Sequence, residues 1–460
     1  MKEYPKSSVM ETPAFRILQK FIAEHRSQSA GEEGSFEEFE REIHRLFQDC
    51  EREVLAEELA SFDVKAPYVI VEGVRYRKAL RAAETYVGQA GPLRVERNLY
   101  QPVGGGRTIC PLELRAGIVG GSWTPRAARI MATVVAEVPP NEAENLIKEF
   151  GGMNPSASSL DRLPKQLSER WEENRCRWED ALRQEISVPQ AAASIVISLD
   201  GVHVPLKKKE IEECQESKNG YREASCGTVS YLDSEGRRLS TTRFGRMPET
   251  KKKTLKGQLS AEFEWAMKER PNLWVIKIAD GAPDNWEFLR ELGGEGVEIL
   301  DFYHAATHLK NAADAVYGAE TSEAKALFES WKTTLKEDPR GAEKVIRALN
   351  YRRDAAKGAA RKVLATELNY FRSQRGGMLY QRFKAENWPI GSGVVEAACK
   401  TVVSERLKQS GMRWSLKGGQ AILTLRSLIQ SDRWEAAWRI LAKSYRESVS
   451  ADRQPVRRAG

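Results

Sequence analysis

Three acidic residues lie in sequence contexts that are typical of metal-binding carboxylates. Asp200 and Asp280 each follow a short apolar run and precede a glycine, and Glu396 comes early in an expected helix after a Gly-rich turn. Oxygen ligands are the ones that Mg²⁺ and Mn²⁺ prefer, and two such ions can clamp the attacking and leaving oxygens of a phosphodiester. If the three residues meet in the fold, they predict such a two-ion site. A strand-end Asp that only forms a turn is the alternative.

The segments around the carboxylates predict an α/β core. Apolar, β-rich runs separated by a hairpin and two helical stretches give the order strand, hairpin, helix, strand, helix, strand. We expect the core to occupy residues 189–304 as a mixed sheet flanked by helices. Residues 305–385 are charged and helical, which indicates an all-helical insertion or lid. Residues 386–445 predict closing helices that carry Glu396.

The rest of the chain divides by composition. We expect a helical region at 1–65, a small β-rich module at 66–115 and a helical region at 116–188, with a polar tail at 446–460. In the region 116–188, two expected helices flank a sharp turn, as in a helix-turn-helix DNA-binding motif. Helical hairpins are also common in proteins that do not bind DNA. The apolar stripe in the first region either packs on the same chain or forms a dimer contact; its members are Phe36, Phe39, Ile43, Phe47, Cys50 and Val54.

The charge distribution and the cysteine content indicate which partner and which cellular compartment to expect. Residues 341–460 hold 24 basic and 10 acidic residues, a net charge of +14, whereas the other 340 residues hold 48 basic and 55 acidic ones. This bias predicts a polyanion partner, nucleic acid before membrane. No apolar run approaches the roughly 18 residues that span a bilayer, and no secretory signal is expected. The six cysteines, Cys214 among them, include no C-x-x-C pair, so we expect reduced thiols in the cytoplasm.

Four segments resemble a known family. They are Ser198–Val202, Ile278–Ala282, Asp301–Leu309 and Pro389–Lys400, the last followed by Ser410–Ser415. Together they look like bacterial insertion-sequence DDE transposases of the ISKra group, which are distantly related to Mutator-type elements. The resemblance covers about residues 66–440. Many relatives carry a Cys-rich zinc module in the N-terminal β region, where this chain has only Cys110.

The resemblance implies a fold, a site and an activity. The fold would be a ribonuclease-H-like core with an all-α insertion before the final Glu. The catalytic triad would fall on Asp200, Asp280 and Glu396, 80 and 116 residues apart, and would hold two Mg²⁺ or Mn²⁺ ions. Water would cut at the element ends, and the exposed 3′-hydroxyl would then attack target DNA.

The implied partners are the terminal inverted repeats and the target DNA, with a homo-oligomer assembled on them at the bacterial nucleoid. Two alternatives remain. One is a non-catalytic DNA-binding regulator derived from a transposase, and the other is a ribonuclease-H-like nuclease that never joins ends.

Further residues are candidates around this site. His304 and His308 share a helix face, and Asp301-x-x-His304 resembles a motif beside the active site of Mutator-like enzymes. We expect His304 to orient the scissile phosphate or a carboxylate; zinc ligation and a hydrogen bond within the core are the alternatives. The candidates for DNA contact are Lys400, Arg406, Lys408, Arg413 and Trp414. The four cations would contact phosphates, and Trp414 could stack on an unpaired base.

Overall fold

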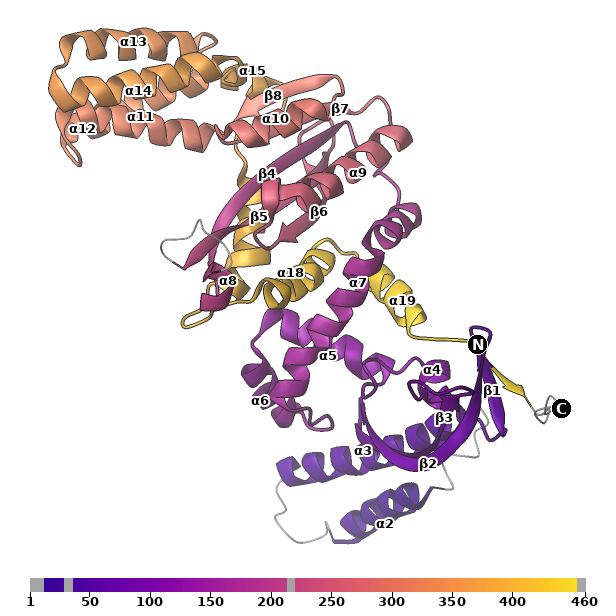
Figure 1. Cartoon of the computed structure of the whole chain (residues 1–460). Helices are drawn as coiled ribbons and strands as arrows, with labels where there is room; N and C mark the ends of the chain where they lie inside the picture. The colour runs from indigo at the N-terminus through magenta and orange to yellow at the C-terminus, as the bar shows by residue number, and fades with distance from the viewer. Residues whose placement is uncertain (1–11, 29–35, 213–219, 453–460) are drawn as a thin grey trace. The chain divides into compact units, whose positions relative to one another are not determined.

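The computed structural model divides the chain into two compact units (Figure 1). Unit 1 comprises the chain up to Trp178 together with the chain from Trp434 onward, and unit 2 comprises Glu179–Arg433. The residues that the structure describes are 12–28, 36–212 and 220–452. Parts of the expected N-terminal region and C-terminal tail, and Cys214, lie outside these ranges. None of the described helices is both long and apolar enough to cross a membrane.

Unit 1 contains a four-stranded antiparallel sheet with the order β3-β2-β1-β9. Its long strands β2 and β3 curve strongly in Figure 1. Buried side chains from α3, β2, β3 and α4, among them Leu59, Tyr86 and Leu112, form its core. The elements are α2 (Pro13–Gln28), α3 (Phe36–Ser61), β1 (Tyr68–Val71), β2 (Val74–Gly88), β3 (Gly91–Pro102), α4 (Pro111–Ala116), α5 (Pro125–Glu137), α6 (Pro140–Phe150), the start of α7 (Ala157–Glu185), α19 (Trp434–Ser444) and β9 (Val449–Asp452).

The apolar stripe expected in the first region lies on α3 and is only partly covered. Ile43 and Cys50 pack with α2 in a small cluster, and Phe39 stacks on Phe21 with ring centroids 5.7 Å apart. Phe36 and Phe47 are 70% and 55% exposed. The stripe therefore packs on the same chain, and two of its aromatic side chains remain exposed.

Strand β9 corrects the expected polar tail. Residues 449–452 pair antiparallel with β1, from Tyr68↔Asp452 to Val71↔Val449, and Arg75 forms an ion pair with Asp452 at 2.8 Å. Val449-Ser450-Ala451-Asp452 is only four residues long, too short for its alternation to predict a strand, so this strand depends on a partner far away in the chain.

The helix-turn-helix candidate consists of α6 and α7. The turn between them begins at Gly151 and Gly152, which have φ of 75° and 80°, a left-handed conformation that glycine adopts without steric cost. These two glycines explain why α6 stops at Phe150. The role of the pair in DNA binding stays a prediction.

Unit 2 contains a five-stranded mixed sheet with the order β6-β5-β4-β7-β8. The β4–β5 and β5–β6 pairs are antiparallel, and the β4–β7 and β7–β8 pairs are parallel. The strands and the helices between them are β4 (Ser194–Pro205), α8 (Lys208–Glu212), β5 (Tyr221–Leu232), β6 (Arg238–Arg246), the 3₁₀ turn η1 (Thr250–Lys252), α9 (Lys253–Glu269), β7 (Trp274–Ala279), α10 (Pro283–Glu291) and β8 (Gly296–Leu300).

Different helices pack on the two faces of this sheet. Side chains alternate along a strand, so Ile195, Ile197 and Leu199 of β4 point to the face where α9 and α10 pack. The other face is covered in part by the C-terminal helices, against which Ala224 and Cys226 of β5 pack. Those elements are α16 (Gly393–Ala398), the π-helical turn η3 (Cys399–Ser404), α17 (Glu405–Leu407) and α18 (Leu416–Gln430).

Residues 302–385 form helices and no strand. Helices α11 to α14 lie side by side in Figure 1 and contact one another in turn. Their buried side chains, including Trp331 and Leu364, belong to the same hydrophobic cluster as the buried residues of the sheet. The elements are α11 (Phe302–Tyr317), α12 (Ser322–Glu337), α13 (Gly341–Ala355), α14 (Gly358–Gln374), the 3₁₀ turn η2 (Arg375–Gly377) and α15 (Tyr380–Ala385).

One buried carboxylate joins the two ends of unit 2. Glu262 on α9 is fully buried and forms ion pairs with Arg183, at 3.6 Å, and with Arg433. It also accepts a hydrogen bond from Thr242 Oγ1 at 3.1 Å. A buried charge needs such partners, so the first and last segments of unit 2 are held against the same helix.

Candidate active site

The three predicted carboxylates line one cavity in unit 2. Asp200, Asp280 and Glu396 lie around a space of about 280 Å³. The remaining lining residues are Leu199, Asp301, Tyr303, His304, Thr307, Ser392 and Val395. Four carboxylates and one imidazole thus come from four separate stretches of sequence.

The sheet register explains why the two aspartates meet. Strands β4 and β7 are parallel neighbours, and Ser198 pairs with Ile278. Each aspartate follows its paired residue by two positions, so Asp200, which lies within β4 opposite Cys226 of β5, is level with Asp280, which comes directly after β7. Helix α16 contacts β4 and β5 and brings Glu396 to the same place.

The hydrogen bonds leave oxygens of these carboxylates unused. Asp280 Oδ1 accepts from Ala282 N at 3.1 Å and from Asn285 Nδ2 at 3.3 Å, and Glu396 Oε1 accepts from Ser392 Oγ at 2.9 Å. Asp200 Oδ1 accepts from Gly201 N at 2.7 Å, whereas its Oδ2 has only the Cys399 thiol at 3.9 Å. Among the described residues, Asp280 and Glu396 therefore each have one oxygen without a hydrogen bond, and Asp200 Oδ2 has only the weak thiol donor, so these oxygens remain available to a further partner.

Asp301 has a different role from the other three. It is 2% exposed, and both of its oxygens accept backbone hydrogen bonds, Oδ1 from His304 N at 2.6 Å and Oδ2 from Ser392 N. The first bond caps α11, and the second fixes the residue whose hydroxyl holds Glu396. Asp301 also follows a buried strand, so the strand-end pattern that marks Asp200 and Asp280 could have identified it; Ser392 carries no such signal.

Negative charges face one another in the cavity. Burial raises the pKa of Asp200, and the charges of Asp280 and Glu396 raise it further. The Gly201 amide and the charge of Lys252 act in the opposite direction. Lys252 itself is already paired with Glu223, at 3.0 Å. The site therefore carries more negative charge than its neighbours neutralise.

The donor chemistry fits hard divalent cations. Every carboxylate oxygen that is left over is a ligand of the type that Mg²⁺ and Mn²⁺ prefer, and the excess negative charge favours a cation. Within the described residues, however, no group of three His, Cys, Asp or Glu side chains is close enough to form a ready-made metal site. The arrangement supplies the oxygens and the charge, and metal binding stays a prediction.

Comparison with solved structures gives a distant similarity, whereas the two sequence comparisons give none. No family model matches the sequence, and no curated protein matches it. Among solved structures, the chain is similar to the Drosophila P element transposase strand transfer complex, with 13% identity, a TM-score of 0.25, and coverage of 70% of this chain and 81% of that one. A similarity of this size carries no functional argument, so function must be inferred from the cavity itself.

The two histidines of α11 have different surroundings. His304 is exposed and lines the cavity. His308 lies one turn further on, where its Nδ1 is 2.6 Å from Glu367 Oε2 and its ring stacks on Tyr370 at 3.6 Å. His308 is therefore bound within the helical segment, and His304 is the one that faces the carboxylates.

Tyr370 brings α14 against the end of β7. A Cβ atom on Gly281 would lie 2.8 Å from the Tyr370 ring, which is too close for any residue other than glycine. Gly281, directly after Asp280, is thus required for this contact. The sequence did not identify Tyr370, because nothing local marks a tyrosine in a charged helix as a neighbour of the site.

Two of the five DNA-contact candidates are placed differently from the expectation. Arg406 is 2% exposed; its guanidinium lies 5.2 Å from the Trp414 ring centroid and contacts Met412 Sδ at 3.6 Å. Trp414 in turn donates from Nε1 to Leu407 O at 3.0 Å. Arg406 is therefore wrong as a surface contact, and Trp414 uses one face of its ring on Arg406. Lys400, Lys408 and Arg413 are exposed.

A π-helical turn separates Glu396 from Arg406. In η3 the backbone leaves the α-helical hydrogen-bond pattern, and the buried Arg426 side chain donates to the carbonyls of Thr401 and Val402, at 3.1 and 3.0 Å for its Nε. Arg426 is 1% exposed. It therefore satisfies the carbonyls of the irregular turn that follows the helix of Glu396.

Arg426→Met is expected to lower the free energy of unfolding by about 3 kcal/mol, because buried carbonyls would lose a charged donor. Urea denaturation measures the effect. Arg361→Met, the same change at an exposed position of α14, is the control and should stay within about 0.5 kcal/mol of the wild type. Equal effects of the two changes would show that Arg426 does not support the turn.

Asp200→Asn is expected to raise the melting temperature at neutral pH in EDTA. A carboxyl whose pKa is raised in the folded state contributes stability below its unfolded pKa and loses it as pH rises through the folded pKa. The gain over wild type should therefore shrink as the pH falls from neutral toward the ordinary range of an aspartate, because the raised pKa lets Asp200 take up its proton in the folded state before it does in the unfolded state. The charged groups that set this behaviour are Asp280, Glu396 and Lys252.

Thermal melts of the wild type, Asp200→Asn and the exposed-site control Glu287→Gln across this pH range test the expectation. Adding Mg²⁺ should stabilise the wild type more than Asp200→Asn, because a ligand that binds only the folded state raises its stability. A gain for Asp200→Asn that is constant with pH would contradict the account.

Proposed function

We propose that this chain is a DNA transposase that cuts and joins phosphodiester bonds at the cavity of Asp200, Asp280 and Glu396. The observation that supports it is the meeting of these three carboxylates, 80 and 116 residues apart in the sequence, around one space. The mixed sheet, with three antiparallel strands followed by two parallel ones, agrees with a ribonuclease-H-like core.

The unused oxygens of the three residues would hold two Mg²⁺ or Mn²⁺ ions. When bound, such ions activate a water or a 3′-hydroxyl and stabilise the attacking and leaving oxygens of a phosphodiester. The protein's own share is positional: Ser392 orients Glu396, Asn285 orients Asp280, and the Gly201 amide orients Asp200. We expect His304, which lines the cavity, to contact a phosphate that enters it.

The test is Mg²⁺-dependent cutting and joining by the full chain. A supercoiled plasmid that carries the flanks of the gene reports nicking, and a pre-cut duplex with a free 3′-hydroxyl reports joining. Cutting together with joining is expected of a transposase. Cutting without joining would identify a nuclease, and binding without cutting would identify a regulator; either result would overturn the proposal.

Exposed cations close to Glu396 in the sequence support DNA binding. We expect Lys400→Gln, Lys408→Gln and Arg413→Gln each to weaken binding to all DNA sequences alike, because contacts to phosphate carry no sequence information. Each change should reduce the slope of log K against log salt by about one. Filter binding at several salt concentrations measures this slope.

Arg406→Gln is the comparison variant, since its side chain is buried. It should lower stability and leave the salt slope of the folded protein unchanged. A reduced slope for Arg406→Gln, with no reduction for the three exposed residues, would contradict the placement of the DNA surface.

A further inference from the structure

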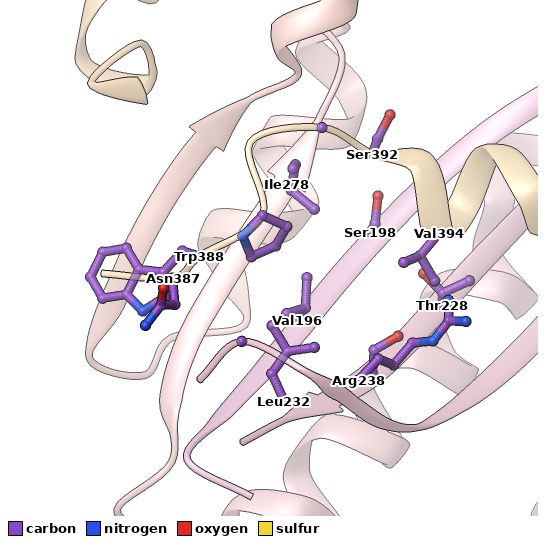
Figure 2. Close-up of a pocket in the computed structure, with 14 residues that line it drawn as sticks. Val196, Ser198, Thr228, Leu232, Arg238, Ile278, Asn387, Trp388, Ser392 and Val394 are labelled. Atoms are coloured by element: carbon purple, nitrogen blue, oxygen red, sulfur yellow. The ribbon is translucent and has the colours of Figure 1, made fainter. Parts of the chain in front are cut away.

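A second cavity lies on the sheet face that the C-terminal helices leave open (Figure 2). Its volume is about 350 Å³, within the usual range for small-molecule sites. The floor consists of Val196 and Ser198 of β4 with Thr228 and Ser230 of β5, which pair as Val196↔Ser230 and Ser198↔Thr228. The segment 387–394, which leads from α15 to α16, forms a wall. We call this space the sheet-face cavity.

The side chains that line the sheet-face cavity favour a ligand with an aromatic ring that has apolar faces and a polar edge. Val196, Leu232, Ile278 and Val394 supply aliphatic surface. Trp388 is held in place by stacking on Trp274, with centroids 5.6 Å apart. Figure 2 shows Trp388 and Asn387 on one side of the cavity and Arg238, Thr228 and Val394 on the other. Apolar walls with a few polar groups are typical of small-molecule sites, and a heteroaromatic ring has the matching apolar faces and polar edge.

One polar atom in the floor lacks a partner. Ser198 is 2% exposed, and among the residues that the structure describes its Oγ has no hydrogen-bond partner. A buried hydroxyl without a partner costs free energy, and a ligand in the cavity would supply one. By contrast, Ser230 Oγ is already paired with Thr241 Oγ1 at 2.8 Å.

The charge of the lining selects an anionic ligand. Arg238 is the single charged residue among the 14 that line the cavity, and no Asp or Glu is among them. Its side chain is exposed, and within the described ranges it has no ion pair. An arginine without a carboxylate partner is a ready phosphate contact.

The cavity adjoins the carboxylate site. Side chains two positions apart on a strand share a face, so Ser198 and Asp200 lie on the same face of β4, about 7 Å apart along the strand. Ser392 lines both cavities and donates to Glu396. An occupant of the sheet-face cavity would therefore lie next to the phosphodiester that the carboxylates act on.

We propose that the sheet-face cavity binds a nucleotide, with its base between the sheet and segment 387–394, an edge of the base at Ser198 Oγ, and its phosphate on Arg238. The nucleotide we expect is an unstacked one next to the cut site in the bound DNA strand. This source rests on the proposed action on DNA; a free mononucleotide has the same chemistry.

Fluorescence titration of the full chain tests the proposal with two probes. One is a short single-stranded oligodeoxynucleotide that carries one 2-aminopurine, and the other is 2-aminopurine deoxyriboside 5′-monophosphate. We expect Arg238→Gln to weaken binding about 10-fold through loss of a charged contact, and Ser198→Ala about 3- to 10-fold through loss of a hydrogen bond. Arg347→Gln, exposed on α13, and Ser194→Ala, buried on the same strand, are the matched controls and should bind as the wild type does.

The two probes separate the sources. A response of the oligonucleotide to both cavity variants supports a strand nucleotide, and a response of the monophosphate alone supports a free nucleotide. If neither probe distinguishes Arg238→Gln and Ser198→Ala from their controls, the proposal is overturned. Cleavage measured in parallel separates this inference from the proposed function. If the wild type cuts DNA but nucleotide binding does not depend on the cavity residues, only this inference is refuted. If nucleotide binding depends on the cavity residues but the wild type does not cut DNA, only the proposed function is refuted.

Discussion

Asp200→Asn, Asp280→Asn and Glu396→Gln are each expected to reduce DNA strand cleavage by at least about 1,000-fold while DNA binding is retained. Each change removes one carboxylate charge and keeps the side-chain shape. The loss is large because metal-assisted stabilisation of the transition state contributes several kcal/mol, and 1.36 kcal/mol corresponds to a factor of ten in rate. Single-turnover nicking in Mg²⁺, with binding measured on the same DNA, gives both quantities.

Asp284→Asn is the matched control for these variants. Asp284 lies four residues after Asp280 and pairs with Lys256 at 3.0 Å on an exposed surface, outside the carboxylate cavity. It should cut DNA at the wild-type rate. Full cleavage by any one of the three variants would remove that residue from the site, and full cleavage by all three would end the proposal of a transposase active at this cavity.

A second large effect is expected at Asp301, which contacts no substrate in our account. Asp301→Ala would remove the cap of α11 and leave the buried Ser392 amide unpaired, at a cost of about 2–4 kcal/mol. It would also release the segment that holds Glu396. A displacement of about 1 Å at a catalytic group can cost about 100-fold in rate, so cleavage should fall by about that factor below the unfolding temperature.

Leu309→Ala distinguishes positioning from mere stability. Leu309 is fully buried on the same helix, and its truncation should cost about 2–5 kcal/mol. We expect this variant to unfold as easily as Asp301→Ala and yet to cut at nearly the wild-type rate with an unchanged Mg²⁺ requirement. Asp301→Asn, which keeps one acceptor oxygen, should fall between Asp301→Ala and the wild type. Equal losses of cleavage in Asp301→Ala and Leu309→Ala would show that Asp301 acts through stability alone.

The parts of the site that could be predicted from sequence are those with a local signal. Asp200 and Asp280 each end an apolar run of strand length, and the parallel register then brings them level. Glu396 has a weaker signal, a place early in an expected helix after a Gly-rich turn, and the resemblance of the segment around it supports the same choice. Asp301 had the strand-end signal, but its role depends on two backbone amides, one of them 91 residues away.

The wrong predictions share a physical cause. Arg406 reads as a solvated charge in a basic helix, and only the packing of Met412 and Trp414 around it shows that it is buried. The π-helical turn before it has no sequence signal and changes which side chains face the solvent. Strand β9 is four residues long, too short to give a clear signal of its own, so its existence depends on pairing with β1.

The pairing of β1 with β9 has a consequence for biosynthesis. The two strands are separated by more than 370 residues, and all of unit 2 lies between them. A nascent chain presents β1 with an open edge until residues 449–452 have left the ribosome, after the whole of unit 2. Unpaired edges invite pairing with other chains, so while unit 2 is being translated this edge is a surface that a chaperone, or a neighbouring nascent chain on the same message, can capture.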